Sequence, residues 1–191
     1  MSKCMIVPGT KLPPFETMAC VGVEPGSEFG SVTSTDFPGK WLVLYTYPKD
    51  FTFVCPTEIV EFDQKLAAFA ERGAVVLGAS TDNEHAHLAW RREHPELRDL
   101  EHPLLFLNPA MAESLGVLHP GAGVAVRATF IVDPERVVRF SSANDLDVGR
   151  NVDEVLRVLD GLQTGELVAC SWKKGQATLT QEGKKALKKA S

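Results

Sequence analysis

The sequence predicts an α/β domain of three layers, in which helices cover both faces of a central sheet. Residues 41–47 (WLVLYTY) and 74–80 (AVVLGAS) are continuous apolar runs, which are typical of strands buried on both faces. Between these runs, residues 54–72 carry apolar side chains at helical spacing, so the three segments form a β-α-β unit. A second group of strands followed by a helix after residue 125 completes the prediction.

The amino-terminal half contains the strands and the helix that define this unit. The first forty residues are rich in Gly, Pro, Ser and Thr, and predict loops with short edge strands. The helix within 54–72 should end at Gly73, a common residue at helix ends. Its buried face is expected to contain Ile59, Phe62, Leu66 and Phe69.

The carboxy-terminal half begins with an insertion at residues 81–120. Its predicted elements are a helix near 84–93, a short strand near 104–107 and a helix near 110–115. Two strands should follow at 126–133 and 136–142, joined at the turn DPER. The last predicted helix covers 151–163, with Asn151 as its N-cap.

The composition excludes several classes of protein. Hydrophobic residues make up 44% and charged residues 24% of the 191 residues, with a net charge of -5, which gives no reason to expect nucleic-acid or membrane partners. The basic tail KKALKK is interpreted as a solvated end. No apolar run is long enough to span a bilayer and no signal peptide is evident, so the expected compartment is the cytoplasm.

Four cysteines are present, and in a cytoplasmic protein they do not suggest a structural disulfide framework. They are Cys4, Cys20, Cys55 and Cys170. No pair has C-x-x-C spacing, so neither a zinc site nor a dithiol redox motif within one loop is expected.

Cys55 is the candidate functional cysteine, because it follows a buried strand at the start of a helix. Sites in open α/β sheets lie beyond the carboxyl ends of strands. The first turn of a helix favours an anion, and a thiolate is such an anion. Pro56 suits a first turn, and Thr52 can direct a hydroxyl to the same place. The alternative is a buried structural cysteine, since free cysteine is among the most buried residue types.

The segment around Cys55, YPKDFTFVCPTEI at 47–59, resembles the active-site segment of the typical two-cysteine peroxiredoxins. Within that family, the resemblance is to the bacterial alkyl hydroperoxide reductases of the AhpC group. The family pattern P-x-x-x-T-x-x-C falls on Pro48, Thr52 and Cys55, which makes Cys55 the peroxidatic nucleophile. The loop PKDFTF is then expected to bring Cys55 to the helix start under an aromatic cover.

Three further segments resemble the same family, so that the resemblance covers about residues 38–179. VRATFIVDPE resembles the segment that carries the essential active-site arginine, here Arg127. GASTDNEHAHLAW and VGRNVDEVLRVLD also match, and the latter places Arg150 near the site. VACSWKKGQATL resembles the segment with the resolving cysteine, here Cys170.

The resemblance implies a fold and a role for each residue. The fold is thioredoxin-like, an α/β/α sandwich with a central mixed sheet and peroxiredoxin insertions. Residues 1–165 would form this domain, and 166–191 a carboxy-terminal segment carrying the resolving cysteine. Thr52 and Arg127 would donate hydrogen bonds to the peroxide, Pro48 would shield the oxidised sulfur from water, and Glu58 and Arg150 would orient Arg127.

The implied activity is that of a thiol peroxidase for hydrogen peroxide and organic hydroperoxides, which acts in antioxidant defence and redox homeostasis without a cofactor or metal. Cys55 would become a sulfenate and then form a disulfide with Cys170 of the other subunit in a head-to-tail homodimer. Related members assemble five dimers into a decamer. A separate protein must reduce the disulfide: a thioredoxin, an AhpF-like flavoprotein or an AhpD-like adaptor.

Other interpretations stay open at this point. His85 and His87 suggest a metal site, but no third ligand is evident, and a solvated helix face is expected instead. A cysteine hydrolase would need a histidine near Cys55. A thiol redox sensor or an oligomeric holdase chaperone is the second functional class. The complete set of Pro48, Thr52, Cys55 and Arg127 favours the enzyme, because a sensor needs no site for two oxygens.

Overall fold

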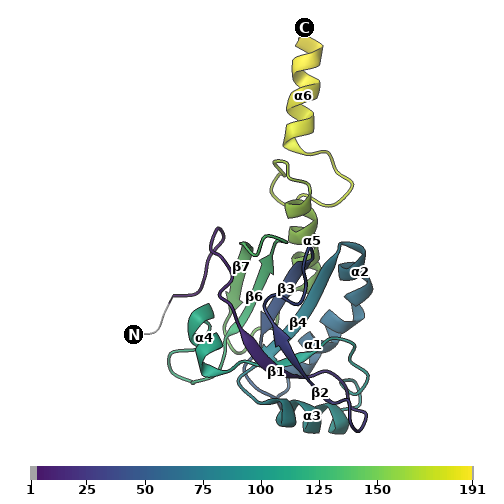
Figure 1. The fold of residues 1–191 in the computed structure, drawn as a ribbon. Coiled ribbons are helices and arrows are strands. Elements are labelled where there is room, and N and C mark those ends of the chain that lie inside the picture. The colour runs from purple at the N-terminus through teal and green to yellow at the C-terminus, as the bar shows by residue number, and fades with distance from the viewer. Residues whose placement is uncertain (1–3, 191) are drawn as a thin grey trace. The chain divides into compact units, whose positions relative to one another are not determined.

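One mixed seven-stranded sheet is the centre of the computed structural model, which describes residues 4–190 (Figure 1). The strand order is β2-β1-β5-β4-β3-β6-β7. The strands are β1 (Glu16–Cys20), β2 (Phe29–Thr33), β3 (Trp41–Thr46), β4 (Ala74–Ser80), β5 (Leu104–Phe106), β6 (Arg127–Val132) and β7 (Val138–Asn144). The helices are α1 (Cys55–Gln64), α2 (Leu66–Glu71), α3 (Glu84–Glu93), α4 (Pro109–Leu115), α5 (Val152–Gln163) and α6 (Leu179–Ala190).

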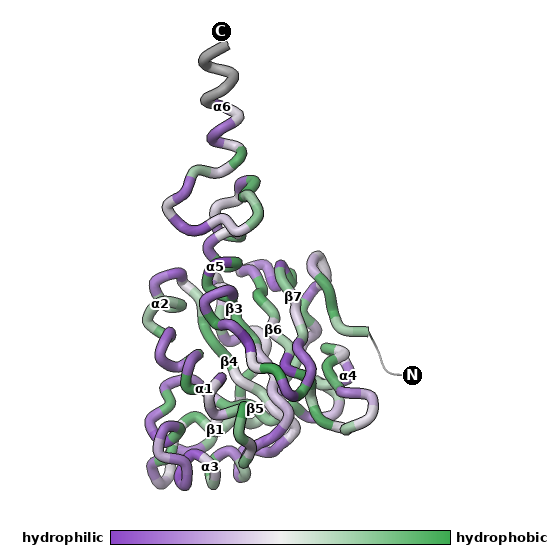
Figure 2. Tube along the Cα trace, turned by 180° about the vertical axis from the view of Figure 1, so that it is seen from behind, coloured by the Kyte–Doolittle hydropathy of each residue, from purple (hydrophilic) through white to green (hydrophobic). Residues whose placement is uncertain are grey.

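The two central strands are buried on both faces, as their continuous apolar sequences predict. Strands β3 and β4 pair in parallel, which confirms the predicted β-α-β unit. Successive side chains of a strand point to opposite faces. On one face, Leu44 belongs to a core cluster that also includes Leu115 of α4; on the other face, the Tyr45 ring stacks on Phe62 of α1 at 4.1 Å. The sheet therefore lies between two layers of helix, and Figure 2 shows its central strands mainly in the apolar colour.

Contacts divide the chain into two compact units, one up to Arg150 and one from Asn151 onward. The sheet and α1 to α4 belong to the first unit, and α5 and α6 to the second. The boundary between these two units precedes α5. The sequence instead predicted a boundary at 165/166, where the segment with the resolving cysteine begins, and that boundary stays a prediction. None of the described helices is long and apolar enough to cross a membrane.

Most predicted elements agree with the structure within two residues, and three differences stand out. The predicted helix over 54–72 is two helices, because the backbone leaves the helical region at Lys65 (φ −102°, ψ 6°). Strand β1 is not an edge strand, since β5 of the insertion pairs on its other side. The sequence predicted no helix at α6, which includes the basic tail interpreted as a solvated end. The N-cap of α5 is confirmed, because the side chain of Asn151 accepts a hydrogen bond from the backbone of Glu154.

Gly78 allows the close approach of β3 and β4. It pairs with Tyr45, and a Cβ at Gly78 would lie 2.6 Å from the Tyr45 hydroxyl oxygen and 3.0 Å from Leu104 Cδ2. The hydroxyl of Tyr45 is held 2.7 Å from His102 Nε2, so it cannot move aside freely. We expect Gly78→Ala to lower the free energy of unfolding by about 1–3 kcal/mol in chemical denaturation.

A matched control for this substitution is Gly30→Ala on the edge strand β2. A Cβ there would meet only the Val21 side chain, at 3.4 Å or more. Equal losses of stability in the two variants would contradict the steric explanation.

Candidate active site

Cys55 occupies the place that the sequence predicts, at the first residue of α1 and beyond the carboxyl end of β3. Its side chain is fully buried. The N-cap residue Val54 has no side-chain capping hydrogen bond, and Pro56 lies in the first turn. No side chain therefore caps the start of α1. The positive end of the helix dipole is directed at the region around the Cys55 sulfur.

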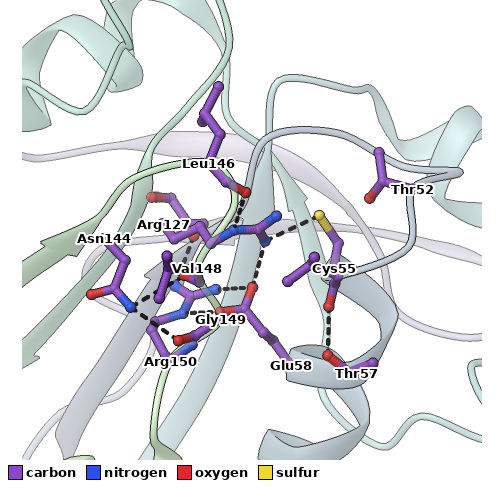
Figure 3. A network of polar contacts seen from close by, with 12 residues as sticks. Thr52, Cys55, Thr57, Glu58, Arg127, Asn144, Leu146, Val148, Gly149 and Arg150 are labelled. Atoms are coloured by element: carbon purple, nitrogen blue, oxygen red, sulfur yellow. Dashed lines mark hydrogen bonds and ion pairs between the residues drawn. The ribbon is translucent and has the colours of Figure 1, made fainter.

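Arg127 is the polar partner of the cysteine (Figure 3). This residue begins β6, which pairs antiparallel with β3, so its side chain comes to the end of β3 where α1 starts. Its Nη1 lies 3.3 Å from Cys55 Sγ and donates to Glu58 Oε2 at 2.7 Å. Its Nε donates to the carbonyl of Leu146 at 2.8 Å. A charged donor is thus fixed on the sulfur atom.

Glu58 lies between two arginines and orients both. Its Oε1 accepts hydrogen bonds from Nε and from the backbone N–H of Arg150, each at 2.8 Å, and its Oε2 accepts from Arg150 Nη2 at 2.9 Å. Arg150 also donates to the carbonyls of Thr46 and Ala128, at 2.7 and 2.8 Å. The guanidinium of Arg127 is therefore held by a buried carboxylate that is itself held by a second guanidinium.

The charge balance of this group favours an anionic sulfur. The side chains of Arg127, Glu58 and Arg150 are each at most 4% exposed. Two buried guanidinium groups and one carboxylate leave one positive charge, and buried charges require partners. Burial opposes the charged form of Arg127, but hydrogen bonding to Cys55 and the charges of Glu58 and Cys55 outweigh it, so the pKa of Arg127 is raised. A thiolate at Cys55 would balance the remaining charge.

A cavity of about 330 Å³ brings Pro48, Thr52 and Arg127 together. Pro48 is buried and presents no N–H group, whereas Thr52 is half-buried and lies on the loop side of the Cys55 sulfur in Figure 3. The hydroxyl of Thr52 donates to the carbonyl of Lys49 at 3.2 Å. All the predicted residues of the first unit are therefore close together, and a small molecule has room beside them.

The two phenylalanines of the active-site loop are exposed rather than packed over Cys55, although Phe53 contributes to the wall of the cavity. Phe53 is 96% exposed and Phe51 is 56% exposed, although the Phe51 ring lies 5.9 Å from that of Trp90. Phe51 also has a left-handed backbone (φ 56°), which is uncommon for a residue other than glycine. Pro48, rather than a phenylalanine, is the buried apolar residue of this loop.

Cys170 belongs to the second unit and is exposed. It lies in a turn before Trp172, whose buried ring donates from Nε1 to the carbonyl of Gln176 at 3.1 Å. Arg157 of α5 donates to the carbonyl of Trp172 at 3.2 Å. The turn is anchored while the thiol stays accessible. Of the other cysteines, Cys4 is exposed and Cys20 is buried.

One group of polar residues was not predicted from the sequence. His87 was expected on a solvated helix face, but it is fully buried and lies 2.7 Å from a carboxylate oxygen of Asp50, whereas His85 is exposed. The spacing to Trp90 and Arg91, three and four residues later, could have indicated a buried face.

The two histidines that suggested a metal site have different surroundings, since His85 is exposed and His87 is buried against Asp50. Among residues 4–190, no group of three potential ligands is placed to hold a metal ion. The hydrogen-bond partner of the Cys55 sulfur is Arg127 rather than a histidine. Nothing in the described site therefore provides the base that a cysteine hydrolase needs.

Comparisons with known proteins identify the family to which the chain is similar. The model of the AhpC/TSA family matches residues 8–141. Alkyl hydroperoxide reductase C of Mycobacterium tuberculosis is 47% identical over 180 residues, which are 90% of this chain and 92% of that protein. Among solved structures, Mycobacterium bovis AhpC has a TM-score of 0.81 and 44% identity, covering 90% of this chain and 100% of that chain.

The similarity extends to a eukaryotic protein. The reduced 2-Cys peroxiredoxin of Plasmodium vivax has a TM-score of 0.83 and 35% identity. The comparison covers 90% of this chain and 92% of that chain. The arrangement of strands and helices is thus shared well beyond the bacterial relatives.

Proposed function

The chain belongs to the AhpC/TSA family and is a thiol-dependent peroxidase of the peroxiredoxin type with a thioredoxin-like fold, and from this premise we propose that Cys55 is its peroxide-reducing thiol. The observation that carries the proposal is the contact of Arg127 Nη1 with Cys55 Sγ at 3.3 Å. Thiolate is the reactive form of cysteine, and a fixed cation stabilises it. The other buried cysteine, Cys20, lies outside this group.

The reaction is a displacement at oxygen. The thiolate of Cys55 donates an electron pair to one peroxide oxygen, an S–O bond forms and the O–O bond breaks. The second oxygen leaves with the electron pair of that bond and takes up a proton, which yields water or an alcohol. The Cys55 sulfur is oxidised to sulfenic acid.

Charge develops on the leaving oxygen, so donors must already be directed at the cavity. Arg127 lines the cavity and supplies a guanidinium. Thr52 supplies a hydroxyl once it gives up its bond to the Lys49 carbonyl. Pro48 has no N–H that would compete for the peroxide.

The substrates that we propose are hydrogen peroxide and organic hydroperoxides. The cavity is large enough for more than two oxygen atoms, and its wall includes the apolar side chains of Val54, Val124 and Leu146. An alkyl group would lie on this wall while the two oxygens reach Arg127 and Cys55. Removal of such peroxides is an antioxidant function.

The second half of the cycle uses Cys170. We propose that its thiol, on the other protomer of a head-to-tail homodimer, attacks the Cys55 sulfenic acid, so that a disulfide forms and water leaves. The exposure of Cys170 favours this role. The dimers would associate into decamers, through the region around 80–82.

Reopening the disulfide requires two electrons from another protein, because the chain has no C-x-x-C pair. The proposed donor is a cytoplasmic dithiol protein: a thioredoxin, an AhpF-like flavoprotein or an AhpD-like adaptor.

Oxidation of the reduced protein with one equivalent of hydrogen peroxide tests this cycle. We expect peroxide to be consumed and a covalent dimer to appear on non-reducing gels. Cys170→Ser should still consume the peroxide but form no dimer, whereas Cys4→Ser and Cys20→Ser should form it. A dimer that persists in Cys170→Ser would assign the resolving role to another cysteine.

A further inference from the structure

We propose that three residues, Tyr47, Asp50 and His87, are positioning residues that hold the active-site loop, residues 47–54, over Cys55. We call these three residues the loop anchor. This inference rests on the proposed role of Cys55. The three side chains are buried and lie at the opposite end of the loop from the helix start. None of them contacts the Cys55 sulfur through a hydrogen bond in the described structure, so their effect must pass through the loop.

The loop anchor joins the loop to two other elements. Asp50 accepts from the Tyr47 hydroxyl at 2.9 Å through one carboxylate oxygen and lies 2.7 Å from His87 Nδ1 through the other. His87 belongs to α3, and its Nε2 lies 3.1 Å from the carbonyl of Leu105 in β5. The first four residues of the loop are thereby tied to a helix and a strand that carry no catalytic group.

Each contact of the anchor needs one donor and one acceptor. The carbonyl of Leu105 only accepts, so His87 Nε2 carries a proton. A second proton lies between His87 Nδ1 and Asp50, because two lone pairs would otherwise face each other at 2.7 Å. The contact is therefore a short hydrogen bond between two buried side chains.

Two further bonds tie the same stretch of loop to the end of β4. The backbone N–H of Asp50 donates to Asp82 Oδ2 at 2.6 Å, and the hydroxyl of Thr81 donates to the carbonyl of Pro48 at 3.0 Å. The next residue, Phe51, has a left-handed backbone that is unfavourable for a phenylalanine. Such a conformation persists only where neighbouring contacts determine it, and the anchor supplies them directly before Phe51.

The consequence for catalysis follows from what the loop carries. Pro48 lies within the anchored stretch, and Thr52 follows two residues after Asp50; both line the cavity beside Cys55. Loss of the anchor would leave these residues free to move away from the peroxide. The peroxide step should slow, whereas disulfide formation, which requires the fully buried Cys55 sulfur to become accessible, should not.

The chain offers a matched control in a second tyrosine and histidine, both buried, that contact a half-buried carboxylate. The Tyr45 hydroxyl lies 2.7 Å from His102 Nε2, and His102 Nδ1 lies 2.8 Å from Asp63 Oδ1. Asp63 lies near the end of α1, eight residues from Cys55, and this group makes no hydrogen bond to the described loop 47–54. His102→Gln therefore disturbs a similar network without touching the active-site loop.

The test uses two substitutions of His87 that each keep one hydrogen bond. The amide of asparagine can replace Nδ1 and donate to Asp50, whereas that of glutamine can replace Nε2 and donate to Leu105. In the reduced full-length protein, hydrogen exchange in peptides covering 47–55 should be at least about tenfold faster in His87→Gln than in the wild type, and close to wild type in His87→Asn. This measurement does not depend on peroxidase activity.

Stopped-flow tryptophan fluorescence then separates the steps. The rate constant for reaction with hydrogen peroxide should fall at least about tenfold in His87→Gln, with disulfide formation unchanged or faster, and should recover in His87→Asn. His102→Gln should leave both rates unchanged. Equal rates in His87→Gln and wild type, or equal losses in both His87 variants, would overturn the loop anchor. A wild-type protein that does not react with peroxide would instead refute the proposed function, while the exchange data would still test the anchor.

Discussion

Cys55→Ser is expected to reduce peroxidase activity at least about a thousandfold while the protein stays folded. A serine hydroxyl is not ionised near neutral pH and cannot form the sulfenic acid on which the cycle depends. The fold should tolerate the change, because serine has nearly the same size as the buried cysteine. Peroxide consumption with a small dithiol reductant measures the activity, and circular dichroism measures the fold.

The matched control for this prediction is Cys20→Ser, at a cysteine that is also fully buried. Its sulfur contacts the carbonyl of Gly22 at 3.3 Å and lies away from the group around Arg127. It should keep its peroxidase activity. Activity of Cys55→Ser within tenfold of wild type would show that the reactive thiol is elsewhere.

Arg127→Met is expected to slow peroxide reduction by about 10²- to 10³-fold or more. The guanidinium contacts the Cys55 sulfur and lines the cavity, so its loss removes stabilisation from both the thiolate and the leaving oxygen. The substitution also leaves Glu58 with Arg150 alone as its charged partner. Competition kinetics with a reporter peroxidase would measure the rate constant, and alkylation of Cys55 by iodoacetamide at neutral pH should slow as well.

Loss of a buried cation can also act through stability, and Arg91→Met controls for this. Arg91 is 1% exposed and donates to several carbonyls, including that of Leu100 at 2.6 Å, but it makes no hydrogen bond to the active-site group. We expect this variant to be less stable than wild type and, where folded, to react with peroxide at the wild-type rate. Equal loss of reactivity in both variants would mean that Arg127 acts through the fold.

Local sequence patterns predicted the central part of the fold well. Strand β4 and helix α3 have the predicted bounds, because continuous apolar runs and helical spacing depend on side chains a few residues apart. The break at Lys65 could not be predicted in this way, since the apolar residues on both sides keep helical spacing through it. The position of β1 between β2 and β5 depends on a pairing with the distant insertion.

For the site, the sequence alone predicted which residues of one short segment lie around the Cys55 thiol. The segment 47–59 places Pro48, Thr52 and Cys55 within eight consecutive residues, at the junction of a strand and a helix. A motif this short is local in space whatever the remaining chain does. Arg127 is 72 residues away, and its role was predicted only from the resemblance of a second segment.

The tertiary structure alone decided how these residues are held. Antiparallel pairing of β3 with β6 brings Arg127 to the sulfur, and the hydrogen bonds between Glu58 and Arg150 join residues that lie 92 positions apart in the chain. Burial decided the case of His87, because only the structure shows that a carboxylate and a carbonyl lie against its two nitrogens, where the sequence had indicated a solvated helix face. Such partners come from separate elements, and only the packing of those elements brings them together.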